Sequence, residues 1–332
     1  MKPFRYLTLL FLFTFVQASI SCESTYVALG LRAAIPSVPV ETKDSLYRLA
    51  NLPTETRKNA ISALSAQEAF DLLSKAMRTS LALHSSGGDT LPTWAHPPYE
   101  KLQEQYPWLK GVSDSSLSPA VKDGFSREWV QQQIREAGKD LADHIVATAP
   151  DRVRAQMAKR LIEEVYELPP DWYPQTRADQ VIDRILDLRA EEVTQRLQEK
   201  SRAEIGAKYG EEETWFEYGN GWLLTPSFEF RLLLDHLKPK PGQTLVDLGS
   251  GLGRQGLYMG LMHPDVNFHG YEIVTERVEE GKRVAKKLGL DSVHFHETNM
   301  ADPHWKPEPA DFYYAFNPVS GATFDKILLD LH

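Results

Sequence analysis

The feature that most constrains this chain is the stretch TLVDLGSGLGR at residues 244–254. A short apolar run contains an acidic residue near its end, Asp247, and glycines follow at Gly249, Gly251 and Gly253. Because glycine has no side chain, backbone N–H groups and the start of the next helix can lie close to a ligand. The stretch therefore predicts a buried strand, a ligand-binding turn and a helix.

Beyond this turn, short apolar runs alternate with helical stretches. The four expected strands are Thr244–Leu248, Phe268–Ile273, Ser292–His296 and Phe312–Phe316. Such alternation is typical of an α/β protein with a parallel sheet, in which the fourth strand lies beside the first. The sequence therefore predicts a half-sheet of about four parallel strands.

Two cofactors are compatible with the glycine-rich turn. Counted from Asp247, the turn reads D-x-G-x-G-x-G, the opening loop of an S-adenosylmethionine (SAM) site. Counted from Gly251, it reads G-x-G-x-x-G, a dinucleotide fingerprint. Both sites need an acidic residue at the end of the second strand to accept ribose hydroxyls. Glu272 in the segment HGYEI is placed for this role.

Three features favour SAM. Asp247 precedes the first glycine by two positions, where its carboxylate would repel a pyrophosphate and attract the positive charges of SAM. The glycines start at Gly249, directly after the strand, so the dinucleotide register would begin two residues late. The fourth strand runs into Asn317-Pro318 at the edge of the sheet where the reactive part of the cofactor is expected.

Residues 211–332 resemble the N-terminal part of a class I SAM-dependent methyltransferase, because VDLGSGLGR and GYEI match two motifs of that superfamily. The upstream segment YGNGWLLTPSFEFRLLLDHL is similar to bacterial proteins grouped with the non-SET histone-lysine methyltransferase family. The resemblance implies a Rossmann-like fold and methyl transfer from SAM, with a protein side chain such as lysine as the favoured acceptor. The superfamily has a seven-stranded sheet, so we expect that the C-terminal part of the fold is missing from this sequence.

The same resemblance implies a set of cofactor-binding residues. These are Asp247, Gly249, Gly251 and Gly253 at the methionine part of SAM, Glu272 at the ribose, Asn299 at the adenine, and Tyr218 and Thr225 in a segment that covers the cofactor. Asp302 is the alternative to Asn299. Asn317 is the candidate catalytic residue, since it would face the transferred methyl group.

No metal site is expected from the sequence. His294 and His296 lie two residues apart on a predicted strand, so both side chains point to one face. Two histidines without a third ligand make a poor zinc site.

Residues 22–210 are expected to form a helical accessory domain. Residues 65–68 (SAQE) form a capping box that begins one helix. Residues 85–125 are rich in Gly, Pro and Ser and predict a long loop. Further helices are expected from near Ser126 and from about Thr176. The helix from Ser126 has one apolar face made of Val130, Ile134, Ala137, Leu141 and Ile145.

The first 21 residues have the layout of a signal peptide. Lys2 and Arg5 precede the apolar run YLTLLFLFTFV, and small residues follow it. Cys22, in the segment SISC, resembles the lipidated cysteine of a bacterial lipoprotein. We therefore expect export or lipid anchoring at the cell envelope, with membrane attachment through the N-terminus. If the leader is not a working signal, the protein stays in the cytoplasm.

The net charge of −9 argues against an extended nucleic-acid surface, because phosphate contacts require clustered Lys and Arg. Two other functions remain open from sequence alone. One is a non-catalytic envelope lipoprotein whose methyltransferase-like half is vestigial. The other is an NAD-dependent oxidoreductase.

Overall fold

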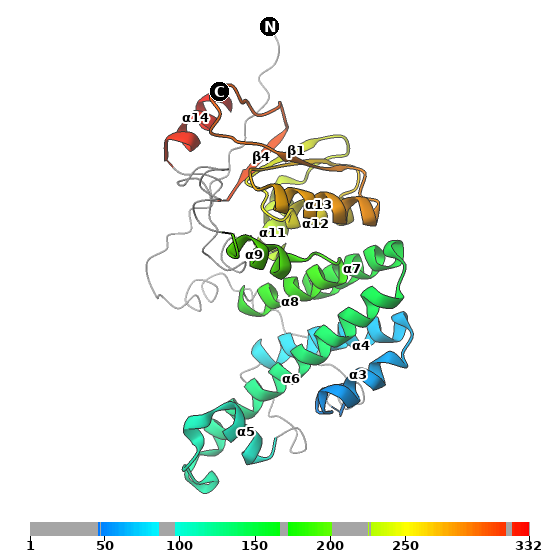
Figure 1. The fold of residues 1–332 in the computed structure, drawn as a ribbon, viewed down its shortest axis with the longest axis vertical. Coiled ribbons are helices and arrows are strands. Elements are labelled where there is room, and N and C mark those ends of the chain that lie inside the picture. Colours follow the sequence, from blue (N-terminus) through cyan, green and yellow to red (C-terminus); the bar gives the residue numbers. More distant parts are fainter. Residues whose placement is uncertain are drawn as a thin grey trace. The chain divides into compact units, whose positions relative to one another are not determined.

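The computed structural model describes residues 46, 48–85, 97–166, 172–200, 225, 227–316 and 321–331. The chain divides into two compact units (Figure 1). One contains the described residues of 31–150 and 160–185, and the other those of 151–159 and 186–332. The domain boundaries expected after residues 21 and 210 both fall outside the described residues, so they stay predictions.

The first unit is helical. Its α-helices are α3 (Thr54–Ser62), α4 (Ala66–Ser85), α5 (Tyr99–Gln105), α6 (Pro119–Thr148) and α8 (Trp172–Ile185). Helix α7 (Asp151–Tyr166) contributes residues to both units. Two short 3₁₀ turns, Pro107–Leu109 and Asp114–Ser116, follow α5. Within the part of the chain that the structure describes, no helix has the length and apolar character needed to cross a bilayer.

The expected capping box is confirmed at the start of α4. The Ser65 N–H donates to Glu68 Oε2 at 2.8 Å, and the Glu68 N–H donates to Ser65 Oγ at 3.3 Å. The expected start of the next long helix, near Ser126, is wrong. Helix α6 begins at Pro119, where Ser118 accepts the Val121 N–H at 3.3 Å and proline occupies the first turn.

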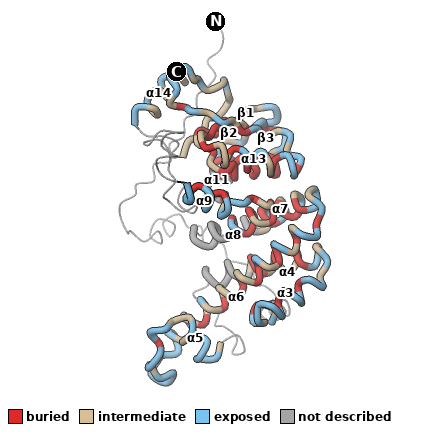
Figure 2. The backbone as a smooth tube through the Cα atoms, in the orientation of Figure 1, coloured by how far each residue is buried: buried red, intermediate tan, exposed pale blue. Residues whose placement is uncertain are grey.

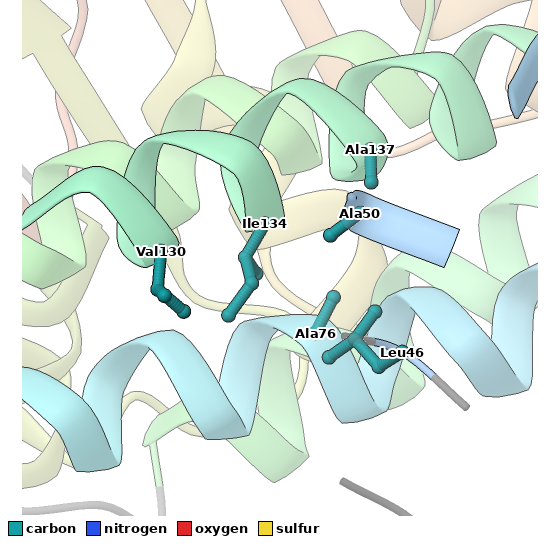
Figure 3. Packing of buried hydrophobic residues seen from close by; sticks show 6 residues of the cluster. All are labelled: Leu46, Ala50, Ala76, Val130, Ile134 and Ala137. Atoms are coloured by element: carbon teal, nitrogen blue, oxygen red, sulfur yellow. The ribbon is translucent and has the colours of Figure 1, made fainter. Parts of the chain in front are cut away.

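The core of this unit lies between α4 and α6. Val130, Ile134 and Ala137 on α6 point toward Ala76 on α4 and toward Leu46 and Ala50 (Figure 3). Leu141 and Ile145, also expected on this face, are fully buried. The apolar stripe read from the sequence is therefore the packing face of α6. In contrast, Leu102 is the one buried residue of α5, whose other residues are intermediate or exposed (Figure 2).

The expected single helix from about Thr176 is two helices. Helix α8 ends at Ile185, and α9 (Ala190–Gln198) begins after a turn in which Asp187 has a left-handed φ of 59°. Arg283 Nη1 and Lys287 Nζ lie 3.0 and 2.9 Å from Asp187 Oδ2. These two ion pairs come from a distant helix, so the break depends on tertiary contacts rather than on local sequence.

The second unit is built on a parallel sheet. Its strands are β1 (Thr244–Leu248), β2 (Asn267–Glu272), β3 (Val293–Glu297) and β4 (Phe312–Ala315), in the order β3-β2-β1-β4. Its further helices are α11 (Ser227–Leu237), α12 (Arg254–Met262), α13 (Thr275–Leu288) and α14 (Gly321–Leu331). The α/β fold, the parallel sheet and the position of β4 beside β1 are therefore confirmed.

Helices cover both faces of this sheet. Helices α11, α12 and α13 lie on one side, and α14 lies on the other (Figure 1). On the α14 side, Ile327 is buried against Val246 and Leu248 of β1. Because side chains alternate along a strand, each strand contributes to both cores.

On the opposite face, one aromatic ring is surrounded by glycines. A Cβ added at Gly253 would overlap the Phe295 ring, and one added at Gly256, Gly270 or Gly281 would lie 2.8, 2.9 or 3.1 Å from it. Distances under 3.0 Å are tighter than real side chains tolerate. The ring of Phe295 therefore fills space that the missing side chains leave open.

Candidate cofactor site

The glycine-rich turn joins the carboxyl end of β1 to α12 and is held against β2. The N–H groups of Gly249 and Ser250 both donate to Tyr271 O at 2.9 Å. The N–H of Gly251 donates to Glu272 Oε2 at 2.9 Å. Gly253, at the N-cap of α12, has a φ of 83°, which glycine adopts without strain. The turn is thus fixed by the neighbouring strand.

Glu272 ends β2 and is 6% exposed. Besides the Gly251 N–H, its carboxylate accepts the Val274 N–H at 2.9 Å through Oε1. Arg277 Nη1 lies 3.7 Å from the same oxygen. A carboxylate has about four acceptor positions, so this group can hold the turn and still accept ligand hydroxyls.

Asp247 lies one residue before the end of β1 and is 2% exposed. Burial raises the pKa of its carboxyl to about 8, and the negative charge of nearby Glu272 contributes to this rise. Two acidic groups thus lie near each other in a buried place, where like charges repel strongly. A positively charged ligand would relieve this repulsion, whereas a pyrophosphate would add to it.

Thr225 is buried and joins α11 to the sheet. Its Oγ1 lies 2.6 Å from the hydroxyl of Tyr314 on β4, and its carbonyl accepts Gln255 Nε2 at 2.8 Å. Tyr314 pairs in register with Asp247. Burial is the main reason why the pKa of Tyr314 is raised well above its usual value. Thr225 is therefore linked, through Tyr314, to the strand adjacent to the one that carries Asp247.

Asn299 follows the carboxyl end of β3. The Thr298 N–H donates to Glu272 O at 2.8 Å, which continues the pairing with β2 up to this point. The side chain of Asn299 is exposed and accepts the Ala301 N–H at 3.0 Å. Asp302, the alternative adenine ligand, is exposed and accepts the His304 N–H at 2.8 Å. Both side chains thus stabilise turns at the edge where Glu272 lies.

Three candidate residues, Tyr218, Asn317 and Cys22, lie outside the described residues. The others, from β1, β2 and the segment after β3, meet at the carboxyl edge of one sheet. Tyr314 and Gln255, which position Thr225, were not expected at the site from the sequence. Ser250 was not expected there either, and its buried Oγ has no hydrogen-bond partner among the described residues. The contacts of Gln255 and Tyr314 with Thr225 join residues 30 and 89 positions apart, so the sequence alone does not reveal them.

The donor set of this edge fits SAM on chemical grounds. It holds two buried carboxyls, Asp247 and Glu272, and the buried Arg254 follows the turn of backbone N–H groups; the buried hydroxyl of Ser250 has no hydrogen-bond partner among the described residues. A sulfonium and an ammonium group would complement Asp247, and a ribose would complement Glu272. The two carboxyls disfavour the phosphates of a dinucleotide at the same place.

Comparison with known proteins agrees with this chemistry. Residues 239–329 match the family described as "Methyltransferase domain". Together with the parallel sheet and the glycine-rich turn, this match identifies residues 239–329 as a class I SAM-dependent methyltransferase segment. The methyl donor of such a domain is SAM.

Three curated relatives are each similar to a short part of this chain. A ribosomal RNA small subunit methyltransferase G of Parabacteroides distasonis is 33% identical over 63 residues, which are 19% of this chain and 27% of the relative. A tRNA (guanine-N(7)-)-methyltransferase of Synechocystis sp. is 37% identical over 74 residues, 22% of this chain and 33% of the relative. A tRNA (guanine-N(7)-)-methyltransferase of Synechococcus sp. is 47% identical over 60 residues, which are 18% of this chain and 25% of the relative. The chain thus spans a quarter to a third of these relatives.

Proposed function

We propose that the unit built on β1–β4 binds SAM and directs its methyl group to a nucleophilic acceptor. The observation that carries this proposal is the pair of buried carboxyls, Asp247 and Glu272, beside a turn of bare backbone N–H groups. Bound there, SAM supplies an electrophilic methyl group on a positively charged sulfur.

Each residue has a defined part in this proposal. Asp247 complements the positive charges of the methionine part, and Glu272 accepts the ribose hydroxyls. Gly249, Gly251 and Gly253 let the donor approach the backbone. Asn299, or Asp302 in its place, lies beside the adenine. Tyr218 and Thr225 belong to the segment proposed to cover the donor.

Catalysis in this proposal is mainly a matter of position. Methyl transfer is an in-line displacement, so the protein has to hold the acceptor within about 3–3.5 Å of the methyl carbon. Asn317, which follows β4, is the residue proposed to face the methyl group. An amine acceptor must be neutral to react, which a desolvated pocket promotes.

A protein side chain such as lysine remains our favoured acceptor. The named relatives are rRNA and tRNA methyltransferases, but their matches cover only a quarter to a third of their length. On α13, Lys282, Arg283 and Lys287 each form an ion pair with a carboxylate of the same unit. Pairing of this kind leaves less positive charge for RNA phosphates.

Binding to the full chain tests the first step. Calorimetric titration with SAM should give saturable binding, and titration with NAD⁺ or NADH should give none. Binding of a nicotinamide cofactor alone would overturn the proposal in favour of an oxidoreductase. Saturable SAM binding without methyl transfer to any acceptor would favour the vestigial, non-catalytic alternative.

The acceptor is tested by incubation with SAM that carries a radiolabelled methyl group. One reaction contains a protein extract treated with nuclease, and the other contains purified tRNA and rRNA. Label in protein, located to lysine by mass spectrometry, supports the favoured acceptor. Label in RNA alone would replace it with a nucleic-acid base.

We also propose lipid attachment at Cys22, which rests on the leader sequence alone. Labelled palmitate should be incorporated into the wild-type protein in a bacterial host and not into Cys22→Ser. Equal labelling of the two would disprove the anchor. Recovery of the unprocessed chain from the cytoplasm would do the same.

A further inference from the structure

A second cluster of polar side chains lies on the α14 side of the sheet, away from the ring of Phe295. His269 and Tyr271 on β2 and His296 on β3 project to this face, because they alternate with Phe268 and Phe295. Tyr271 pairs in register with His296, so His269 and His296 are diagonal neighbours. Their rings stack with centroids 5.3 Å apart and an interplanar angle of 10°.

A carboxylate from the connection between β3 and β4 completes the cluster. Glu308 Oε1 lies 2.6 Å from His269 Nδ1 and accepts the Tyr271 hydroxyl at 2.9 Å. His269 Nδ1 also lies 3.1 Å from His296 Nε2. One ligand atom from each of His269, His296 and Glu308 therefore falls within 4.8 Å of the other two.

A proton satisfies this arrangement poorly. If His269 Nδ1 carries a proton, that proton is shared between Glu308 and His296. If it carries none, its lone pair faces the lone pairs of Glu308 at 2.6 Å. A cation at the centre would accept all three lone pairs together. Tetrahedral ligands about 2.0–2.1 Å from an ion are roughly 3.3 Å apart, which small side-chain rotations would reach.

The donor set indicates the kind of cation. Two imidazole nitrogens and one carboxylate oxygen suit Zn²⁺ and neighbouring divalent transition metals, whereas Mg²⁺ and Ca²⁺ prefer all-oxygen sites. The three side chains are partly exposed, so water can occupy a fourth position. We propose that His269, His296 and Glu308 bind one divalent transition-metal ion, with Zn²⁺ as the best match. The ion ties the β3–β4 connection to the sheet.

Metal titration of the full chain without an affinity tag tests this site. After removal of metals with a chelator, one equivalent of Co²⁺ should give the visible d–d absorption of a tetrahedral site, and Zn²⁺ should abolish it. His296→Ala should lower the affinity by more than about tenfold, because even outer-shell changes cost 10–100-fold. His304→Ala is the matched control, since His304 is an exposed histidine of the same connection and lies outside the cluster.

Glu308→Gln provides a second variant, because its amide oxygen still accepts the Tyr271 hydroxyl. Zn²⁺ should raise the Tm of the wild-type protein and of His304→Ala, and leave that of Glu308→Gln unchanged. No Co²⁺ absorption, or equal affinity in wild type and His296→Ala, would overturn the proposal. SAM titration of the metal-free protein is a separate measurement, so failure of either proposal is recognised independently.

Discussion

The N–H of Gly251 donates a hydrogen bond of 2.9 Å to Glu272 Oε2, so the acid that ends β2 closes the turn that follows β1. The other oxygen of this carboxylate accepts the Val274 N–H. Glu272 is therefore a structural part of the turn before any ligand is considered. Its proposed contact with ribose uses acceptor positions that these two bonds leave open.

Glu272→Gln should weaken SAM binding by more than about tenfold. Hydrogen bonds to charged groups contribute roughly 1.5–3 kcal/mol, and the glutamine amide would present one donor where two backbone N–H groups need acceptors. Glu297→Gln is the control, because Glu297 is the exposed register partner of Glu272 on β3. Calorimetric titration of both variants checks this, and equal affinities would contradict it.

The affinity for SAM should rise with pH up to about pH 8. Asp247 has a pKa of about 8 in the ligand-free protein, and the cationic donor prefers its ionised form. Below that pH, binding must release a proton. The α-amino group of SAM also titrates near pH 8 and affects both proteins alike. The difference in pH dependence between wild type and Asp247→Asn therefore gives the contribution of the Asp247 carboxyl. A pH dependence that is identical in the variant would contradict the role given to Asp247.

Asp247 should also make the ligand-free protein less stable as pH rises. An unfolded aspartate ionises near pH 3.9, so between that value and about 8 the folded state binds the additional proton. The free energy of unfolding should therefore fall with rising pH across this window. Urea denaturation should show that Asp247→Asn removes this part of the slope and is more stable than wild type at pH 8.5. A less stable variant at that pH would contradict the argument.

Gly253→Ala should lower the free energy of unfolding by more than Gly289→Ala does. Both glycines have a positive φ, 83° and 69°, so both changes cost about 1–2 kcal/mol of backbone strain. Only at Gly253 would the new Cβ overlap the Phe295 ring, since Gly289 has open space around its Cα. The difference in urea midpoints measures the steric part alone. Equal midpoints would show that the ring moves aside.

In the helical unit, Asp140→Ala should lower the free energy of unfolding by about 3 kcal/mol, because it leaves the buried guanidinium of Arg57 without its carboxylate. Arg57 Nε donates to Asp140 Oδ2 at 2.7 Å, and the two side chains are 5% and 14% exposed. Glu136→Ala removes the partner of Lys139 from an exposed pair on the same helix and should cost less than about 1 kcal/mol. Thermal or urea denaturation of the two variants checks the contrast.

The strands were predictable because their signal is local. Apolar residues bounded by Gly and Pro place each of the four strands to within about one residue, and the order of the sheet follows from general rules of α/β topology. Asp247 and Glu272 were predictable for the same reason, since each lies at or near the end of its strand.

Features that depend on distant partners were not predictable. The break between α8 and α9 is held by Arg283 and Lys287, about a hundred residues along the chain. His296 clusters with Glu308 and with His269 of the neighbouring strand, which the spacing of His294 and His296 in the sequence does not indicate. The start of α6 at Pro119 was a missed local signal, because Ser118-Pro119 is a good cap.

The contact of Phe295 with four glycines limits the order in which substitutions can accumulate in this unit. A larger residue at Gly253, Gly256, Gly270 or Gly281 would meet the ring, so it becomes acceptable only after position 295 has become smaller. A smaller residue at 295, in turn, leaves a void that a side chain at Gly281 can fill, whereas Gly256 and Gly270 are also blocked by Phe268 and Ser250, and Gly253 has a positive φ. Three elements and the turn before α12 therefore meet at one ring, and in related sequences positions 281 and 295 should change together.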